Sequence, residues 1–111
     1  MSKPADLVQG TLDMLILKIL ALQSMNGCTI SQRLQQISSD VLGVSDGSLH
    51  PALHKLEHHG WIRAQWKSSE NNRRSKFYSL TPLGRKQLEK ETANWNRVSA
   101  AISGIVQLKE A

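Results

Sequence analysis

The 111-residue chain lacks the features on which several classes of protein depend. Its single cysteine, Cys28, allows neither an intrachain disulfide nor a cysteine-based zinc cluster, which fits a reducing, cytoplasmic setting. The longest nearly apolar run, from Met14 to Leu22, is interrupted by Lys18 and is too short to cross a bilayer. The N-terminus lacks the basic start, the apolar stretch and the cleavage site that a signal peptide has. We therefore expect a cytoplasmic protein without membrane association.

Acidic residues are scarce compared with basic ones. Nine Asp and Glu stand against 14 Lys and Arg, which gives a formal net charge of +5. Between Lys55 and Lys90 the basic residues outnumber the acidic ones three to one. A local basic surface attracts polyanions such as nucleic acids, although a merely solvated surface has the same composition. The chain length suits one domain, 1–111.

Apolar residues at three- and four-residue steps predict three helices in the first half of the chain. The first begins at Thr11, and its wide apolar face suggests burial by a partner on a second side. The second begins near Thr29, a plausible N-cap after a break at Asn26-Gly27. The third begins at Ser45 or Asp46 and ends at Gly60.

The third predicted helix combines a leucine side with a polar side. Leu49, Leu53 and Leu56 align on the first, whereas the second is polar and rich in histidine. Pro51 removes a backbone donor and presses on the carbonyl of Gly47, so we expect a tight or irregular first turn. The alternative is that Pro51 marks a helix that begins one turn later.

Two segments after Gly60 predict a β-hairpin. Residues 61–66 alternate, with Ile62, Ala64 and Trp66 on one face and Arg63 and Gln65 on the other. Residues 76–80 form the partner strand, in which Tyr78 and Leu80 are expected to face the core. The polar segment 67–75 between them carries basic residues and turn formers. A cationic hairpin directly after an amphipathic helix is the arrangement of a winged helix-turn-helix. We therefore expect a mainly α fold with a small hairpin (α+β), in which residues 10–80 form this unit.

Thr81 and Pro82 predict the start of a last helix, 82–109. An apolar seam runs along it, and at about 25 residues, or roughly 38 Å, it is longer than so small a core can cover. Part of the seam is therefore expected to face another chain, the alternative being that it folds back on its own domain. The expected dimer interface comprises Leu12, Ile16, Leu88, Trp95, Val98, Ile102 and Ile105.

These segments together resemble the PadR-like family of transcriptional regulators, specifically the short class with a single C-terminal dimerisation helix. The resemblance covers nearly the whole chain. It rests on Gly10-Thr11-Leu12, Gly47 to Leu53, Leu56-Glu57, Gly60-Trp61-Ile62, Asn72 to Thr81 and Gly84. His50 stands where the family usually has tyrosine, and Cys28, soon after the glycine, stands where the family usually has an aromatic residue.

The resemblance implies a homodimer that binds double-stranded DNA, with the third helix in a major groove and the hairpin along the backbone or minor groove. Its activity would be transcriptional regulation, most often repression at a palindromic operator. By chemistry, the hairpin cations suit phosphates and the helix side chains suit base edges. The expected DNA-binding residues are Ser48, His50, Pro51, His54, Lys55, Lys67, Arg73, Arg74 and Lys76.

Histidine is confined to the third predicted helix, at positions 50, 54, 58 and 59. The spacing of the first three allows a metal site, but cysteine and well-placed carboxylates are missing, so no metal or other cofactor is expected. A stripe of imidazoles facing a groove would instead strengthen DNA binding at mildly acidic pH. Plain surface exposure is the alternative for His58 and His59.

Trp95 has two interpretations, because a large indole packs well in an interface and some members of the resembled family use a tryptophan there to bind aromatic effectors. An enzyme is not expected, since no catalytic or phosphate-loop pattern is present. The competing class is a winged-helix adaptor that binds RNA or a protein without operator specificity.

Overall fold

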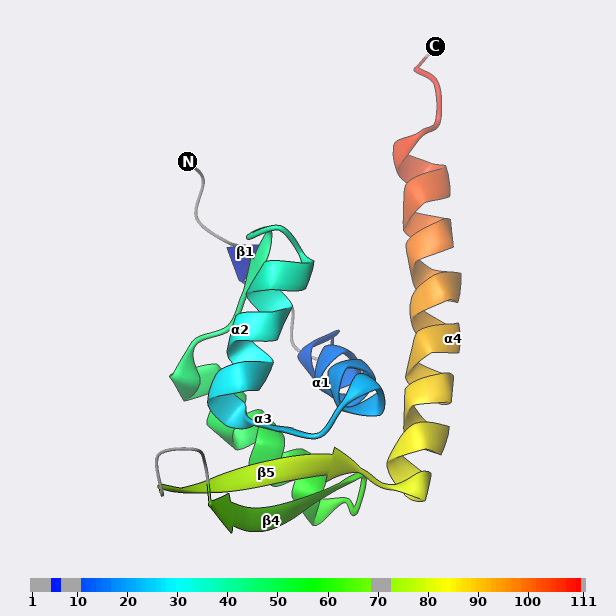
Figure 1. The fold of residues 1–111 in the computed structure, drawn as a ribbon. Helices are drawn as coiled ribbons and strands as arrows, with labels where there is room; N and C mark the ends of the chain where they lie inside the picture. Colours follow the sequence, from blue (N-terminus) through cyan, green and yellow to red (C-terminus); the bar gives the residue numbers. More distant parts are fainter. Residues whose placement is uncertain (1–4, 7–10, 69–72, 111) are drawn as a thin grey trace.

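The part of the chain that the structure describes forms four helices, a small antiparallel sheet and a separate pair of short parallel strands (Figure 1). The computed structural model describes residues 5–6, 11–68 and 73–110. The helices are α1 (Thr11–Leu22), α2 (Gly27–Ile37), α3 (Asp46–His58) and α4 (Pro82–Val106). The strands are β1 (Ala5–Asp6), β2 (Met25–Asn26), β3 (Leu42–Gly43), β4 (Ile62–Ser68) and β5 (Arg74–Leu80). The expected class, a mainly helical winged helix-turn-helix with a long C-terminal helix, is confirmed.

The sheet has the order β2-β5-β4 and is antiparallel throughout. In the β4–β5 hairpin, hereafter the wing, Ile62 lies opposite Leu80 and Ser68 lies opposite Arg74. Strand β2 adds a short third strand, with Met25 opposite Tyr78. β1 and β3 form a separate parallel pair. Both wing strands extend further than the sequence predicted, because the ladder continues beyond the part of the hairpin that covers the core.

Helix α1 lies at the centre of the molecule. It packs against α2, α3, α4 and β5, and its Ile16 and Leu17 are fully buried. Elements of its own chain cover most of its apolar face, whereas Met14 and Leu15 are partly exposed and Leu22 is exposed, so burial of a second side by a partner stays a prediction. The other fully buried large side chains come from α2, α3 and β4: Ile30, Leu49, Leu53, Leu56 and Ile62.

The helix starts follow local side-chain chemistry. Ser45 caps α3 and Thr81 caps α4, as expected, each accepting a hydrogen bond from a backbone N–H three residues on. Helix α2 starts two residues earlier than expected. Its N-cap is Asn26, whose side-chain oxygen accepts a hydrogen bond from the Thr29 N–H at 2.8 Å. Asn26, which was predicted to belong to the break before the helix, therefore caps the helix.

Pro51 lies inside α3, and the helix does not start after it. The first turn is tight, because the Ser45 carbonyl accepts hydrogen bonds from both Ser48 and Leu49, at 3.1 and 2.9 Å. Pro51 is the sixth residue of α3, so it cannot donate the usual bond to the Gly47 carbonyl, and its ring presses on that carbonyl, where a glycine adjusts most easily. The alternative start one turn later is therefore wrong.

Helix α4 runs along one side of the molecule and extends beyond it (Figure 1). Near its start Leu88 is buried in the core, whereas Ile102 and Ile105 are exposed. The helix ends at Val106, short of the expected residue 109. The radius of gyration is 16.0 Å, compared with about 13 Å for a compact chain of this length. None of the helices in the described ranges combines the length and apolar character needed to cross a bilayer.

Candidate nucleic-acid interface

One face of α3 is open to solvent along its whole length. Leu49, Leu53 and Leu56 anchor the helix to the core, and this orientation turns the polar residues outward. The exposed residues include every candidate that the sequence placed on this helix: Ser48, His50, Pro51, His54 and Lys55. With its first-turn amide groups near the surface, this face can approach the edges of bases and phosphates.

The wing supplies cations beside α3. Lys67 and Arg74 are exposed on β4 and β5, and Arg73 is exposed just before β5. The Arg74 guanidinium lies 5.6 Å from the centre of the Trp66 ring, and the Lys67 ammonium lies 5.6 Å from the centre of the Phe77 ring. Both cations thus rest against aromatic faces while remaining accessible. The residues 69–72, part of the predicted turn, lie outside the described residues.

Two of the candidate lysines are engaged in ion pairs. Lys55 Nζ lies 2.5 Å from the carboxylate of Asp13 in α1, and Lys76 Nζ lies 3.4 Å from Glu57 in α3. The first pair joins α3 to the central helix, and the second joins the wing to α3. Lys55 and Lys76 therefore hold the two candidate DNA-contacting elements in place, and their charges are partly compensated within the chain.

A hollow of about 410 Å³ lies between the start of α2, the exposed face of α3 and the wing. His50 and His54 enter it from α3, while Trp66, Arg74 and Lys76 enter it from the wing. The described residues that line it include no carboxylate. This hollow, hereafter the wing hollow, is therefore suited to a polyanion. Cys28 also lines it and is exposed.

Trp66 lies on the same face of β4 as Ile62, but the two side chains differ in exposure. Ile62 at the start of the strand is 2% exposed, whereas Trp66 is 58% exposed. The core ends before the strand does, so the same face of β4 passes from the core into the wing hollow. Trp66 is thus part of the candidate interface.

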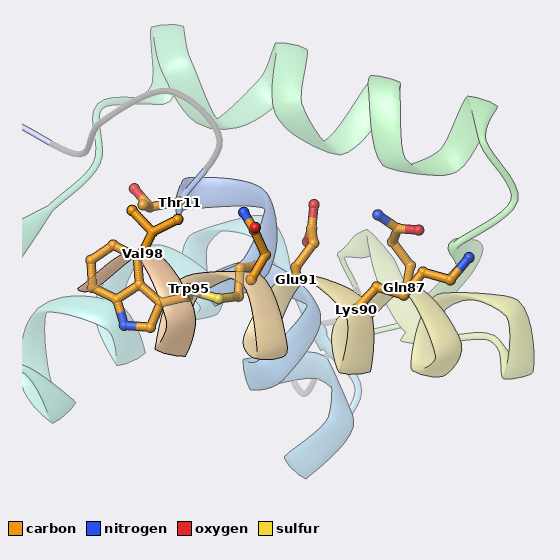
Figure 2. Close-up of a pocket in the computed structure, with 8 residues that line it drawn as sticks. Thr11, Gln87, Lys90, Glu91, Trp95 and Val98 are labelled. Atoms are coloured by element: carbon orange, nitrogen blue, oxygen red, sulfur yellow. The ribbon is translucent and has the colours of Figure 1, made fainter. Parts of the chain in front are cut away.

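A second hollow, of about 510 Å³, lies between α1 and α4. Figure 2 shows Trp95 and Val98 at one end of its lining and Gln87 and Lys90 at the other, with Glu91 between them. Glu91 Oε2 is buried without a hydrogen-bond partner among the described residues. Burial raises the pKa of the Glu91 carboxyl, while a hydrogen bond with Gln87 works in the opposite direction.

The remaining histidines have separate surroundings. His59 stacks on Trp61, with ring centres 4.4 Å apart and planes 15° apart, so it packs against the start of the wing. His58 is exposed near His54 and Lys76. Within the described ranges, no three His, Cys, Asp or Glu side chains are grouped closely enough to hold a metal ion.

The expected interface residues divide between core and surface. Leu12, Ile16 and Leu88 are buried in the core of the chain itself, whereas Trp95, Ile102 and Ile105 are exposed and Val98 is half-buried. Sequence reasoning missed Asp13, Glu57 and Trp66 as parts of the site. Asp13 carried a signal, being an acid within an apolar helix, but its partner could be found only in space.

The sequence profile of the transcriptional regulator PadR-like family matches residues 16–90. The chain is similar to a PadR-like transcriptional regulator from Bacillus cereus, at 28% identity and a TM-score of 0.78, over 91% of this chain and 96% of the other. It is also similar to a protein of known structure from Streptococcus mutans, at 28% identity and a TM-score of 0.81, over 100% of both chains. A further relative is an uncharacterized protein X from Lysinibacillus sphaericus, 24% identical over 88% of this chain and 90% of that protein.

Proposed function

The chain belongs to the PadR-like family of transcriptional regulators, whose members are not enzymes, and from this membership we propose that it represses a promoter by binding a specific duplex operator. The observation that carries the proposal is the wing hollow. Two elements that can contact a duplex, the exposed face of α3 and the wing, enclose a concave surface whose described lining residues include no carboxylate. In such an arrangement α3 enters a major groove and the wing follows the adjacent backbone.

We propose that the active species is a cytoplasmic homodimer in which residues 10–80 read DNA and residues 82–109 join two chains. The support is the exposed apolar seam of α4, with Trp95, Ile102 and Ile105 at 45, 55 and 70% exposure. A two-fold axis along this seam would pair two α3 helices. The operator would then be palindromic, with half-sites about one helical turn or a multiple of it apart.

We further propose that an aromatic small molecule releases the protein from DNA by binding in the hollow between α1 and α4. Trp95 lines this hollow and offers an exposed indole face for stacking. Packing against a second chain is the other use of the same indole. Titration with aromatic compounds, followed by Trp95 fluorescence in a Trp61→Phe and Trp66→Phe background, separates the two, because packing alone gives no saturable response.

Nuclease footprinting on the protein's own promoter tests the central proposal. The expected result is a protected palindrome at moderate salt. An adaptor that binds RNA or a protein through the same fold would protect no duplex at low salt and would retain single-stranded or structured RNA in a parallel filter-binding assay. That outcome would remove the repressor proposal.

Replacing Arg73 and Arg74 by alanine tests the phosphate contacts. Both side chains are exposed on the wing. The double variant should bind all duplexes more weakly and should lower the slope of log K against log salt by about one unit per lost phosphate contact. Fluorescence anisotropy between low and moderate salt measures both. An unchanged slope would place these arginines away from DNA.

A further inference from the structure

The aromatic side chains of this chain are few, and one of them has no structural use in the fold. Tyr78 is buried, Phe77 and Trp61 are partly buried, and Trp95 lies on the apolar seam of α4. Trp66 remains, 58% exposed in the middle of a strand. Single exposed apolar residues are ordinary on protein surfaces, so the surroundings of Trp66 decide whether it has a role.

Those surroundings place a flat apolar surface among cations. Trp66 pairs with Lys76 across the hairpin, and the Arg74 guanidinium lies 5.6 Å from its ring centre. His50 and His54 of α3 line the same hollow from the opposite wall. The indole is therefore bordered by potential cations or hydrogen-bond donors from two elements, and among the described residues no carboxylate lines the wing hollow.

A DNA strand has a matching alternation. Its phosphates are anionic, whereas the deoxyribose between two phosphates presents C–H groups that gain from contact with an apolar plane. The bases of a duplex are stacked inside it, so an aromatic side chain beside the backbone meets sugars before it meets base faces. One DNA backbone separates the major groove from the adjacent minor groove. When a helix lies in the major groove and a wing lies at the minor groove, this backbone must pass between them.

We propose that Trp66 is a direct DNA-contact residue whose indole packs against a deoxyribose of this strand, while Arg74 contacts a neighbouring phosphate. The inference rests on the proposed DNA-binding function and adds a contact that the charge pattern does not reveal. Because the contact is apolar, it contributes affinity that does not depend on salt. Tryptophan and arginine are also the residues in which binding energy is most often concentrated at interfaces.

The test compares Trp66→Ala with three other variants in anisotropy titrations of the promoter duplex. Trp66→Ala should weaken binding roughly tenfold and leave the salt slope unchanged, whereas Arg74→Ala should lower the slope. Gln65→Ala alters an exposed residue on the other face of β4 and should bind as the unmodified protein does. Trp66→Phe keeps an aromatic plane and should retain most of the affinity. Thermal unfolding followed by circular dichroism checks that all variants remain folded.

A double variant separates direct contact from an indirect effect through Arg74. In the Arg74→Ala background, Trp66→Ala should still weaken binding several-fold. If the second substitution costs nothing there, Trp66 only positions Arg74 and the proposal is overturned. Unchanged binding of Trp66→Ala alone overturns it as well. If the unmodified protein binds no duplex, the proposed function fails instead, and the two failures are thereby distinguished.

Discussion

At the scale of single residues, ion pairing separates the basic side chains of the candidate interface. Asp13 and Glu57 partly compensate Lys55 and Lys76, whereas Arg74 lines the wing hollow beside the Trp66 ring. The Asp13–Lys55 pair is asymmetric, because the aspartate side chain is 11% exposed and the lysine side chain is 47% exposed. A buried carboxylate depends on its partner more than a half-exposed ammonium does.

This asymmetry gives a prediction for stability. Lys55→Met keeps the aliphatic stem but leaves the Asp13 carboxylate buried without its cation, and it should lower the free energy of unfolding by about 2 kcal/mol. Asp13→Asn leaves Lys55 free to turn to water and should cost less than about 1 kcal/mol. Urea unfolding of the two variants measures the difference. Equal costs would show that the pair is solvated on both sides.

At the scale of elements, local signals predicted the helices and the wing well and their ends less well. Ser45 and Thr81 are residue types that favour the N-cap position, and each caps its helix at the start that the sequence predicted. Asn26 beside Gly27 is typical of a turn as well as of a cap, and only the packing of α2 on α1 selects the cap. The exposure of Trp66 could not be predicted, because strand alternation gives the face on which a side chain lies but not the distance along the strand at which the core ends.

The junction between the wing and α4 predicts a strong effect of one methyl group. A Cβ added at Gly84 would lie 1.9 Å from the Trp61 carbonyl oxygen. Gly84→Ala should therefore cost about 3 kcal/mol, because backbone on both sides must move. Gly104→Ala is the matched control in the same helix, since nothing lies within 4 Å of its added Cβ. It should stabilise the helix by about 0.5 kcal/mol. Thermal unfolding of both variants measures the contrast, and a similar melting temperature for the two would contradict it.

The contact between α1 and α4 predicts a pH dependence through Glu91. Its pKa is raised in the folded protein by burial, so between its unfolded and folded pKa values the native state binds more protons than the unfolded state. Stability from this group therefore falls as pH rises through that window. Glu91→Gln should raise the melting temperature at pH 7, and the gain should disappear at pH values below the pKa of this carboxyl in the unfolded chain. A gain of equal size at both pH values would assign the effect to packing.

At the scale of the whole molecule, the extended shape depends on α4. The longest dimension is 64 Å against 36 and 21 Å for the other two. The outer half of this helix contributes no buried side chain to the hydrophobic core. The buried large side chain of α4 is Leu88, which lies near the helix start. The apolar seam beyond it accounts for the proposed pairing of two chains.

Charged residues on that seam should separate the proposed dimer. Ile102→Asp with Ile105→Asp should give a monomer by light scattering, with the helix-turn-helix still folded and operator affinity reduced at least a hundredfold, because each half-site is then bound alone. Ala93→Asp with Ala100→Asp adds the same charge on the opposite side of α4 and should leave the dimer intact. A dimer that survives the first pair of substitutions would place the interface elsewhere.

The outer half of α4, residues 95–106, has a consequence for dosage. A helical segment of about twelve residues is marginal in water when little packs against it. Its order would then be completed by a second chain, so that folding of this segment and pairing of the two chains become one equilibrium. Occupancy of an operator by such a protein rises with the square of its concentration at low abundance. A promoter under its control would therefore respond to a threshold amount of protein rather than in proportion to it.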